Sequence, residues 1–178
     1  MIAMRQGRHY WSRWARTFVV ISAIGGFVLA AQTAVADSCD LSAAAKARDE
    51  ADIKETMAAY NAALNGGETT AVLLLYTDDG VFMPPYSNSA AGKEAVKKAY
   101  NKVFDELKFH VQFAIAEPVV MAPTWAYVRT NSAGTTDHHS TGKTTAEANQ
   151  ELFIFEKSDD GKWRIARYSF SPTSPPRP

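Results

Sequence analysis

Hydrophobic and polar residues follow a helical period in the first part of this chain. The segment 41–65 is rich in Ala, Lys and Glu, and its large apolar residues recur at spacings of four, three and four: Ile53, Met57, Tyr60 and Leu64. This spacing predicts a helix with one apolar stripe, which Gly66-Gly67 ends. A short helix is predicted over 69–75, and a third helix over 93–107 has its apolar residues on one face.

The period changes to two after residue 108. Phe109, Val111 and Phe113 alternate with polar or small neighbours, as in a half-buried strand. The segment 133–145, which is full of Gly, Ser, Thr and His, is predicted to be a loop. The other predicted strands lie at 81–83, 119–121, 125–132, 147–156 and 163–170. Helices that precede a run of antiparallel strands indicate an α+β domain, with the helices on one face of a curved sheet.

The first 36 residues have the pattern of an export signal. Four arginines precede an uncharged apolar run from Thr17 to Ala31, and Ala34-Val35-Ala36 fits a signal-peptidase site. The run is shorter than the roughly 20 residues that span a bilayer, so cleavage is favoured over a retained membrane anchor. We therefore predict a periplasmic or secreted protein with no membrane attachment after cleavage. The expected parts are a signal peptide (1–36), a flexible N-terminus (37–47), one domain (48–171) and a Pro-rich tail (172–178).

Charge and cysteine content narrow the possible functions. The chain has 19 basic and 19 acidic residues, and removal of the leader leaves 15 basic residues, a formal charge of −4. No basic patch remains, which argues against a nucleic-acid partner. Cys39 is the single cysteine, so no internal disulfide can form. A mature chain of this length suits one domain with one core.

Four stretches of the sequence carry a family resemblance. LYTDDGVFMPP (75–85), GKEAVKKAY (92–100), WAYVRTNSAGT (125–135) and NQELFIFEKSDDGKWRIARYSF (149–170) resemble the SgcJ/EcaC group of the SnoaL-like, nuclear transport factor 2-like superfamily. The resemblance implies a cone, in which a strongly bent antiparallel sheet packs on about three N-terminal helices and encloses a pocket. It also implies a small apolar ligand and a homodimer, which we expect to form through the sheet face.

The resemblance implies two kinds of function. In ketosteroid isomerase and the SnoaL-type cyclases, an acidic residue in the cone moves a proton beside a carbonyl, and hydrogen-bond donors hold the enolate. We therefore expect a cofactor-independent isomerase, cyclase or hydratase acting on a hydrophobic substrate. The alternative is a non-catalytic ligand-binding or association module in the periplasm, because one fold supports many functions. The sequence has no Gly-rich dinucleotide fingerprint, so no cofactor is expected.

Three charged residues in the predicted strands are the candidate catalytic groups. Strand alternation gives Glu151 the same face as Asn149 and Phe153, and if neighbouring faces coincide, Arg129 and Arg167 lie beside Glu151. Glu151 would then be a general base, or the arginines would clamp an anionic substrate. Alternatively, the three residues form an ion-pair network that fixes strand register. The network is the simpler interpretation, because two arginines would lower the pKa of Glu151 and weaken it as a base.

Aromatic residues are the candidate pocket lining, although core packing is the commoner explanation of such spacings. Tyrosines are of most interest, since a phenol can donate a hydrogen bond to a carbonyl oxygen. The expected ligand-binding residues are Tyr60, Phe82, Tyr86, Tyr100, Phe104, Phe113, Asn149 and Phe153. No metal site is expected, because the adjacent histidines in Asp137-His138-His139 point in different directions and few further ligands remain.

Overall fold

The computed structural model describes residues 42–173. The expected signal peptide and residues 174–178 of the expected tail lie outside this range. The elements follow the order α1 (Ala43–Gly66), α2 (Thr69–Leu74), β1 (Tyr76–Met83), β2 (Ala90–Ala91), α3 (Lys93–Glu106), β3 (Leu107–Ala122), β4 (Trp125–His138), β5 (Lys143–Lys157) and β6 (Trp163–Pro172). None of these helices is both long and apolar enough to span a membrane.

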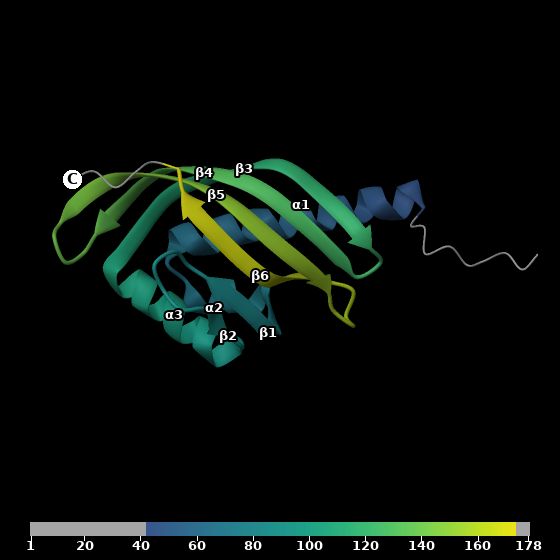
Figure 1. Ribbon diagram of the computed structural model, residues 1–178, viewed down its shortest axis with the longest axis horizontal. Coiled ribbons are helices and arrows are strands. Elements are labelled where there is room, and N and C mark those ends of the chain that lie inside the picture. The colour runs from purple at the N-terminus through teal and green to yellow at the C-terminus, as the bar shows by residue number, and fades with distance from the viewer. Residues whose placement is uncertain (1–41, 174–178) are drawn as a thin grey trace, which may run out of the picture. The chain divides into compact units, whose positions relative to one another are not determined.

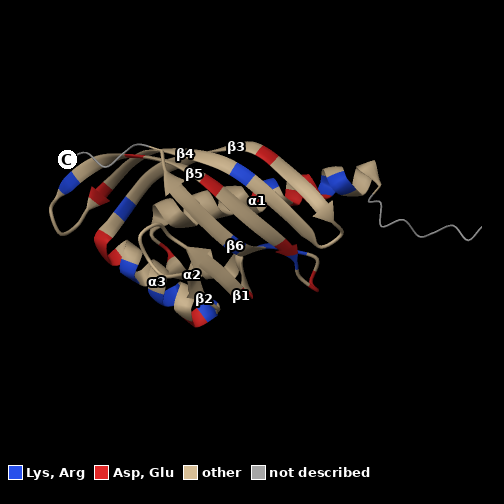
Figure 2. Cartoon of the chain, in the orientation of Figure 1, with Lys and Arg blue, Asp and Glu red and all other residues tan. Residues whose placement is uncertain are grey.

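One curled, unclosed sheet holds all six strands in the order β2-β1-β6-β5-β4-β3. Its pairs are antiparallel except for β1 and β6, which run parallel. The long strands β3, β4 and β5 arch over α1, and α2 and α3 lie below them on the same side of the sheet (Figure 1). The predicted α+β class is confirmed, because the helices cover one face of a bent sheet. Lys and Arg are interspersed with Asp and Glu, and most of each strand carries neither (Figure 2).

The strands run further than the sequence predicted. The segment 133–145 is not a loop: β4 continues to His138 and β5 begins at Lys143. Its polar residues alternate in burial, with Thr136 1% exposed and Thr135 at the surface. Pro118 also does not interrupt β3, because a register shift between Ile115 and Glu117 accommodates it. The polar composition of this segment therefore led to a loop prediction where the chain forms a regular hairpin.

Helix α1 packs against the concave side of the sheet. Ser42 caps it by accepting a hydrogen bond from the Ala45 amide at 3.2 Å, and Gly67, at φ 70°, ends it. The predicted stripe is buried, with Ile53 and Tyr60 at 0% and 1% exposure. The helix begins at Ala43, inside the segment expected to be flexible. At the other terminus β6 extends to Pro172, which pairs with Asn149 at the end of the sheet.

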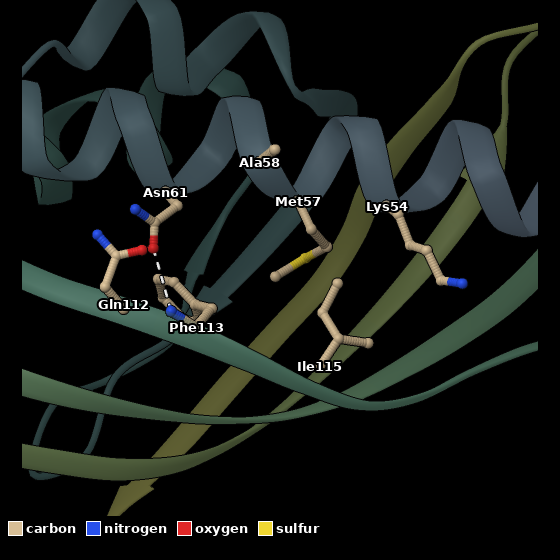
Figure 3. A pocket seen from close by; sticks show the side chains of 7 residues that line it. All are labelled: Lys54, Met57, Ala58, Asn61, Gln112, Phe113 and Ile115. Carbon is tan, nitrogen blue, oxygen red and sulfur yellow. Dashed lines mark hydrogen bonds between the residues drawn. The ribbon is translucent and has the colours of Figure 1, made fainter.

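Side-chain amides of α1 form hydrogen bonds with backbone groups of β3, the edge strand of the sheet. The Asn65 amide donates to the Val111 carbonyl at 2.8 Å and accepts from the Val111 amide at 2.9 Å. One turn earlier, Asn61 accepts from the Phe113 amide at 3.1 Å, the dashed bond in Figure 3. These bonds replace those of a neighbouring strand, so β3 is fixed against the helix along the hollow drawn in Figure 3.

Candidate functional site

A pocket of about 510 Å³ lies between the concave face of the sheet, α1 and α3. Its walls are mostly apolar, and rings from both helices and several strands contribute to them. The aromatic lining consists of Tyr60, Phe82, Tyr86, Tyr100, Phe109, Phe113, Tyr168 and Phe170. A concave apolar site of this size, with few polar groups, is the usual form of a small-molecule site.

The rings hold one another in fixed orientations. Phe82 stacks between Tyr100, with ring centroids 4.7 Å apart, and Tyr168, at 5.6 Å. Tyr168 in turn stacks on Phe153 at 4.0 Å. Such pairs contribute roughly 0.5–1.5 kcal/mol beyond their buried area. The aromatic wall is therefore formed by the packed core rather than by loose surface side chains.

Three tyrosine hydroxyls form a chain at the base of the pocket. The Tyr60 and Tyr100 hydroxyl oxygens lie 2.7 Å apart, and those of Tyr100 and Tyr76 lie 3.0 Å apart. Burial raises the pKa of all three phenols well above its ordinary value. All three therefore stay neutral and can donate hydrogen bonds. Tyr76 was not predicted as a site residue, because β1 begins there and not at the predicted residue 81.

Glu151 is a buried carboxylate without a cationic partner among residues 42–173. It is 3% exposed, and the hydroxyls of Thr130 (2.6 Å) and Ser132 donate to its two oxygens. Burial raises the pKa of Glu151, the nearby Glu147 raises it further, and the two hydroxyl bonds oppose this rise. Within residues 42–173 the ion pairs all involve other carboxylates.

The expected cluster of Arg129, Glu151 and Arg167 does not form. Arg129 donates to Glu117 at 3.0 Å, and Arg167 lies 3.4 Å from Asp79. Both arginine side chains are partly solvent-exposed, at 56% and 36%. The prediction that neighbouring faces bring these residues together was therefore wrong.

Strand register explains this difference. Glu151 pairs with Thr130, so Arg129 on β4 has the opposite orientation. On β6 the register shifts between Ile165 and Arg167, and Ala166 is the extra residue. This bulge reverses the alternation, so that Tyr168 faces the core in the place that simple alternation gave to Arg167.

A polar strip crosses the sheet side of the pocket. Ser132, Asn149 and Glu147 all line it. The Asn149 amide donates to Ser132 at 3.4 Å and to one oxygen of Glu147 at 3.1 Å, while Thr136 donates to the other oxygen at 2.6 Å. Asn149 was predicted, but Ser132 and Glu147 were not. The period of two from Ser132 through Thr136 was the signal that could have extended both strands and found them.

Six of the eight predicted ligand-binding residues line the pocket. Tyr60, Phe82, Tyr100, Phe113 and Asn149 line the pocket. Tyr86 also lines it and is 88% exposed, with a positive φ of 59°.

Two predicted lining residues pack outside the pocket lining. Phe104 packs against Tyr100 and Phe109, and Phe153 lies behind Tyr60 and Tyr168. These two rings support the pocket wall.

Two other places that the sequence or the surface suggests as sites have simple polar contacts. The hollow of about 260 Å³ between α1 and β3 has Lys54 as its one ionisable lining residue (Figure 3). Near the tip of β4, Asp137 accepts from Thr144 at 2.6 Å and lies 3.0 Å from His110, while His138 bonds Thr145. Across residues 42–173 no group of three or more His, Cys, Asp or Glu residues is placed to hold a metal ion.

Comparison with known proteins places this geometry in a family. The sequence profile described as SnoaL-like domain matches residues 57–166. A ketosteroid isomerase-like protein from Erwinia carotovora atroseptica is 39% identical, with 71% of this chain and 98% of the other covered and a TM-score of 0.69. No curated protein sequence matches the chain.

Two further solved structures share the architecture. A putative calcium/calmodulin dependent protein kinase II association domain from Xanthomonas campestris is 25% identical, with 74% and 90% of the two chains covered and a TM-score of 0.58. A nuclear transport factor 2-like superfamily protein from Salmonella enterica is 15% identical, with 72% and 93% covered and a TM-score of 0.64. At that identity the likeness shows the fold alone, and it agrees with the cone.

Proposed function

Because the chain belongs to the family of SnoaL-like domains, we propose that it is a member of the SgcJ/EcaC group that binds a small, mostly apolar molecule and transfers a proton on it without a cofactor. The reaction class is isomerisation, cyclisation or hydration of a substrate with a carbonyl group. The observation that carries this proposal is Glu151, a carboxylate with a raised pKa and no cationic partner in the described residues, next to an apolar pocket.

Glu151 is suited to act as the general base. Catalytic carboxylates work best when their pKa is moved toward the operating pH, and burial does this here. Glu151 reaches the pocket through Ser132, whose hydroxyl bonds the carboxylate and whose side chain lines the cavity. In the relay, Ser132 Oγ takes the substrate proton while its own proton passes to Glu151. The return of that proton by the same path restores both residues.

The tyrosine chain is suited to hold the oxyanion. Three hydroxyls that share two hydrogen bonds leave one proton free for a ligand oxygen. Tyr60, one end of the chain, lines the pocket, so the free proton points to the cavity when Tyr76 donates to Tyr100 and Tyr100 donates to Tyr60. Fixed donors in a dry site stabilise a developing negative charge far better than water-exposed ones do.

An exchange assay tests catalysis without knowledge of the natural substrate. 2-Tetralone, a small aromatic ketone, is incubated in D₂O, and loss of the α-proton signal is followed by NMR. Wild-type protein should accelerate the exchange, and Glu151→Gln should reduce that acceleration by about 100-fold or more. Glu156→Gln is the matched control, because it removes a carboxylate from the same strand on the outward face. Wild-type rates in folded Glu151→Gln would refute the base assignment.

One observation favours the non-catalytic alternative. Glu151 is only 3% exposed, and Ser132 stands between it and the cavity. If wild-type protein binds 2-tetralone but exchange runs at the rate of buffer, the domain is a ligand-binding module. A binding titration with 2-tetralone beside the exchange assay therefore separates the two candidates.

We also propose that the protein is exported and forms a homodimer through the outer face of its sheet. That face exposes apolar side chains, including Leu152 (43%) and Trp125 (37%), beside the half-buried Tyr127 and Ile154. Sedimentation velocity should report a dimer that Leu152→Glu dissociates, and a monomeric wild type would refute it. Cell fractionation tests the export.

A further inference from the structure

The pocket has a negative charge that nothing in its described lining balances. Glu147 lines the wall, and Glu151 lies directly behind Ser132. The lining contains no Lys or Arg, and His138, its one imidazole, bonds Thr145 Oγ1 through Nε2 at 2.9 Å. Neither glutamate takes part in an ion pair among residues 42–173.

The partners that these carboxylates do have are neutral. Thr136 and Asn149 donate to Glu147, and Thr130 and Ser132 donate to Glu151. Neutral hydroxyls and amides satisfy hydrogen-bonding capacity but leave the negative charge in place. The carboxylates also repel each other, since Glu147 raises the pKa of Glu151.

Aromatic rings beside these carboxylates provide the chemistry that attracts a cation. Phe170 pairs with Glu151 across β5 and β6, and it lines the pocket together with Phe109 and Phe113. The faces of aromatic rings carry a negative potential, and they attract organic cations more strongly where water is excluded. Most of the remaining lining is apolar, so it fits a hydrophobic body.

We infer that the ligand of this pocket is an organic cation, an apolar body that bears a protonated or quaternary amine directed at Glu147 and Glu151. The inference rests on the proposed function, because it takes the same cavity as the ligand site. It adds the charge of the ligand, which the reaction class alone leaves open.

Three probes of one shape test the charge preference by calorimetric titration. At about pH 7, 2-naphthylmethylamine is a cation, 2-naphthylmethanol is neutral and 2-naphthoate is an anion. The ammonium probe should bind about tenfold tighter than the alcohol, and the naphthoate should bind weakest. Glu147→Gln and Glu151→Gln should each lower the ratio of ammonium to alcohol affinity several-fold. Glu156→Gln makes the same change in net charge and should keep the ratio of the wild type.

The outcomes distinguish this inference from the proposed function. If the alcohol binds as tightly as the ammonium probe while 2-tetralone exchange is still accelerated, the cation inference is wrong and the catalytic proposal stands. If the ratio falls equally in Glu156→Gln, net charge rather than the pocket causes the preference, and the inference is also wrong. If none of the three probes binds while 2-tetralone exchange is accelerated, only the cation inference is wrong; if exchange also runs at the rate of buffer, both proposals fail.

Discussion

Thr130 and Glu151 lie opposite each other on β4 and β5, and the Thr130 hydroxyl donates a 2.6 Å hydrogen bond to the Glu151 carboxylate. A neutral hydroxyl therefore occupies the position next to Glu151 where an arginine was expected. Burial raises the pKa of Glu151, and no Lys or Arg in the described part of the chain pairs with it to lower that pKa. This hydrogen bond therefore agrees with an acid/base role for Glu151 and not with a role in a structural ion pair.

The pH dependence of stability should change in Glu151→Gln. The pKa of Glu151 is higher in the folded chain than in the unfolded chain, where it is about 4.3. The folded state then binds more protons between the two values, so the unfolding free energy falls as the pH rises through this window. Glutamine cannot titrate, so the variant should gain stability relative to wild type toward neutral pH. Urea denaturation measured from about pH 4 to 8 checks this, and Glu156→Gln should keep the wild-type slope.

Asp49 is the buried carboxylate that does have a cationic partner. It is 3% exposed, lies 2.5 Å from Lys157 Nζ, and accepts from the Trp163 indole at 3.1 Å. It therefore joins α1 to the β5–β6 hairpin. Asp49→Ala leaves the lysine and the indole without this partner and should cost about 3–5 kcal/mol of unfolding free energy.

Lys157→Met provides the comparison for that measurement. The lysine side chain is 28% exposed, so its loss should cost less than Asp49→Ala. A double-mutant cycle by chemical denaturation gives the coupling between the two residues. A coupling near zero would show that the pair does not stabilise the fold.

Tyr100 is the central member of the tyrosine chain. Tyr100→Phe removes the partner of both Tyr60 and Tyr76 and should lower the unfolding free energy by about 1–3 kcal/mol. Tyr76→Phe should cost less, because Tyr60 and Tyr100 keep their bond. Thermal or urea unfolding of the two variants checks the order, and equal losses would mean that the chain does not act as described.

Arg129→Ala and Arg167→Ala should be mild. Both arginines form partly exposed pairs, with Glu117 and Asp79, and such pairs contribute about 0–1 kcal/mol. Neither residue lines the pocket, so probe affinities should stay those of the wild type. A loss of 3 kcal/mol or more in either variant, measured by urea denaturation, would instead agree with the buried network that the sequence suggested.

The pattern of apolar and polar residues predicted correctly those features that depend on a single helix or strand. The spacing of Ile53, Met57 and Tyr60 gave α1 and its buried stripe, and the order of helices and strands gave the α+β class. Much of the aromatic lining also followed, since large apolar rings in such elements turn toward the one available core. The polar hairpin between β4 and β5 did not follow, because its Thr and Gly residues are equally typical of loops.

The sequence by itself determined that Glu151 lies in a strand among buried apolar residues. Only the tertiary structure decided its neighbours. Thr130 and Ser132 reach it because the register of β4 against β5 is set by pairing along the whole hairpin. Arg167 turns away because one extra residue, Ala166, reverses the alternation of β6. The alternation of side chains predicts their orientation along a strand only as far as the next bulge. The register between strands depends on contacts between residues that are distant in sequence.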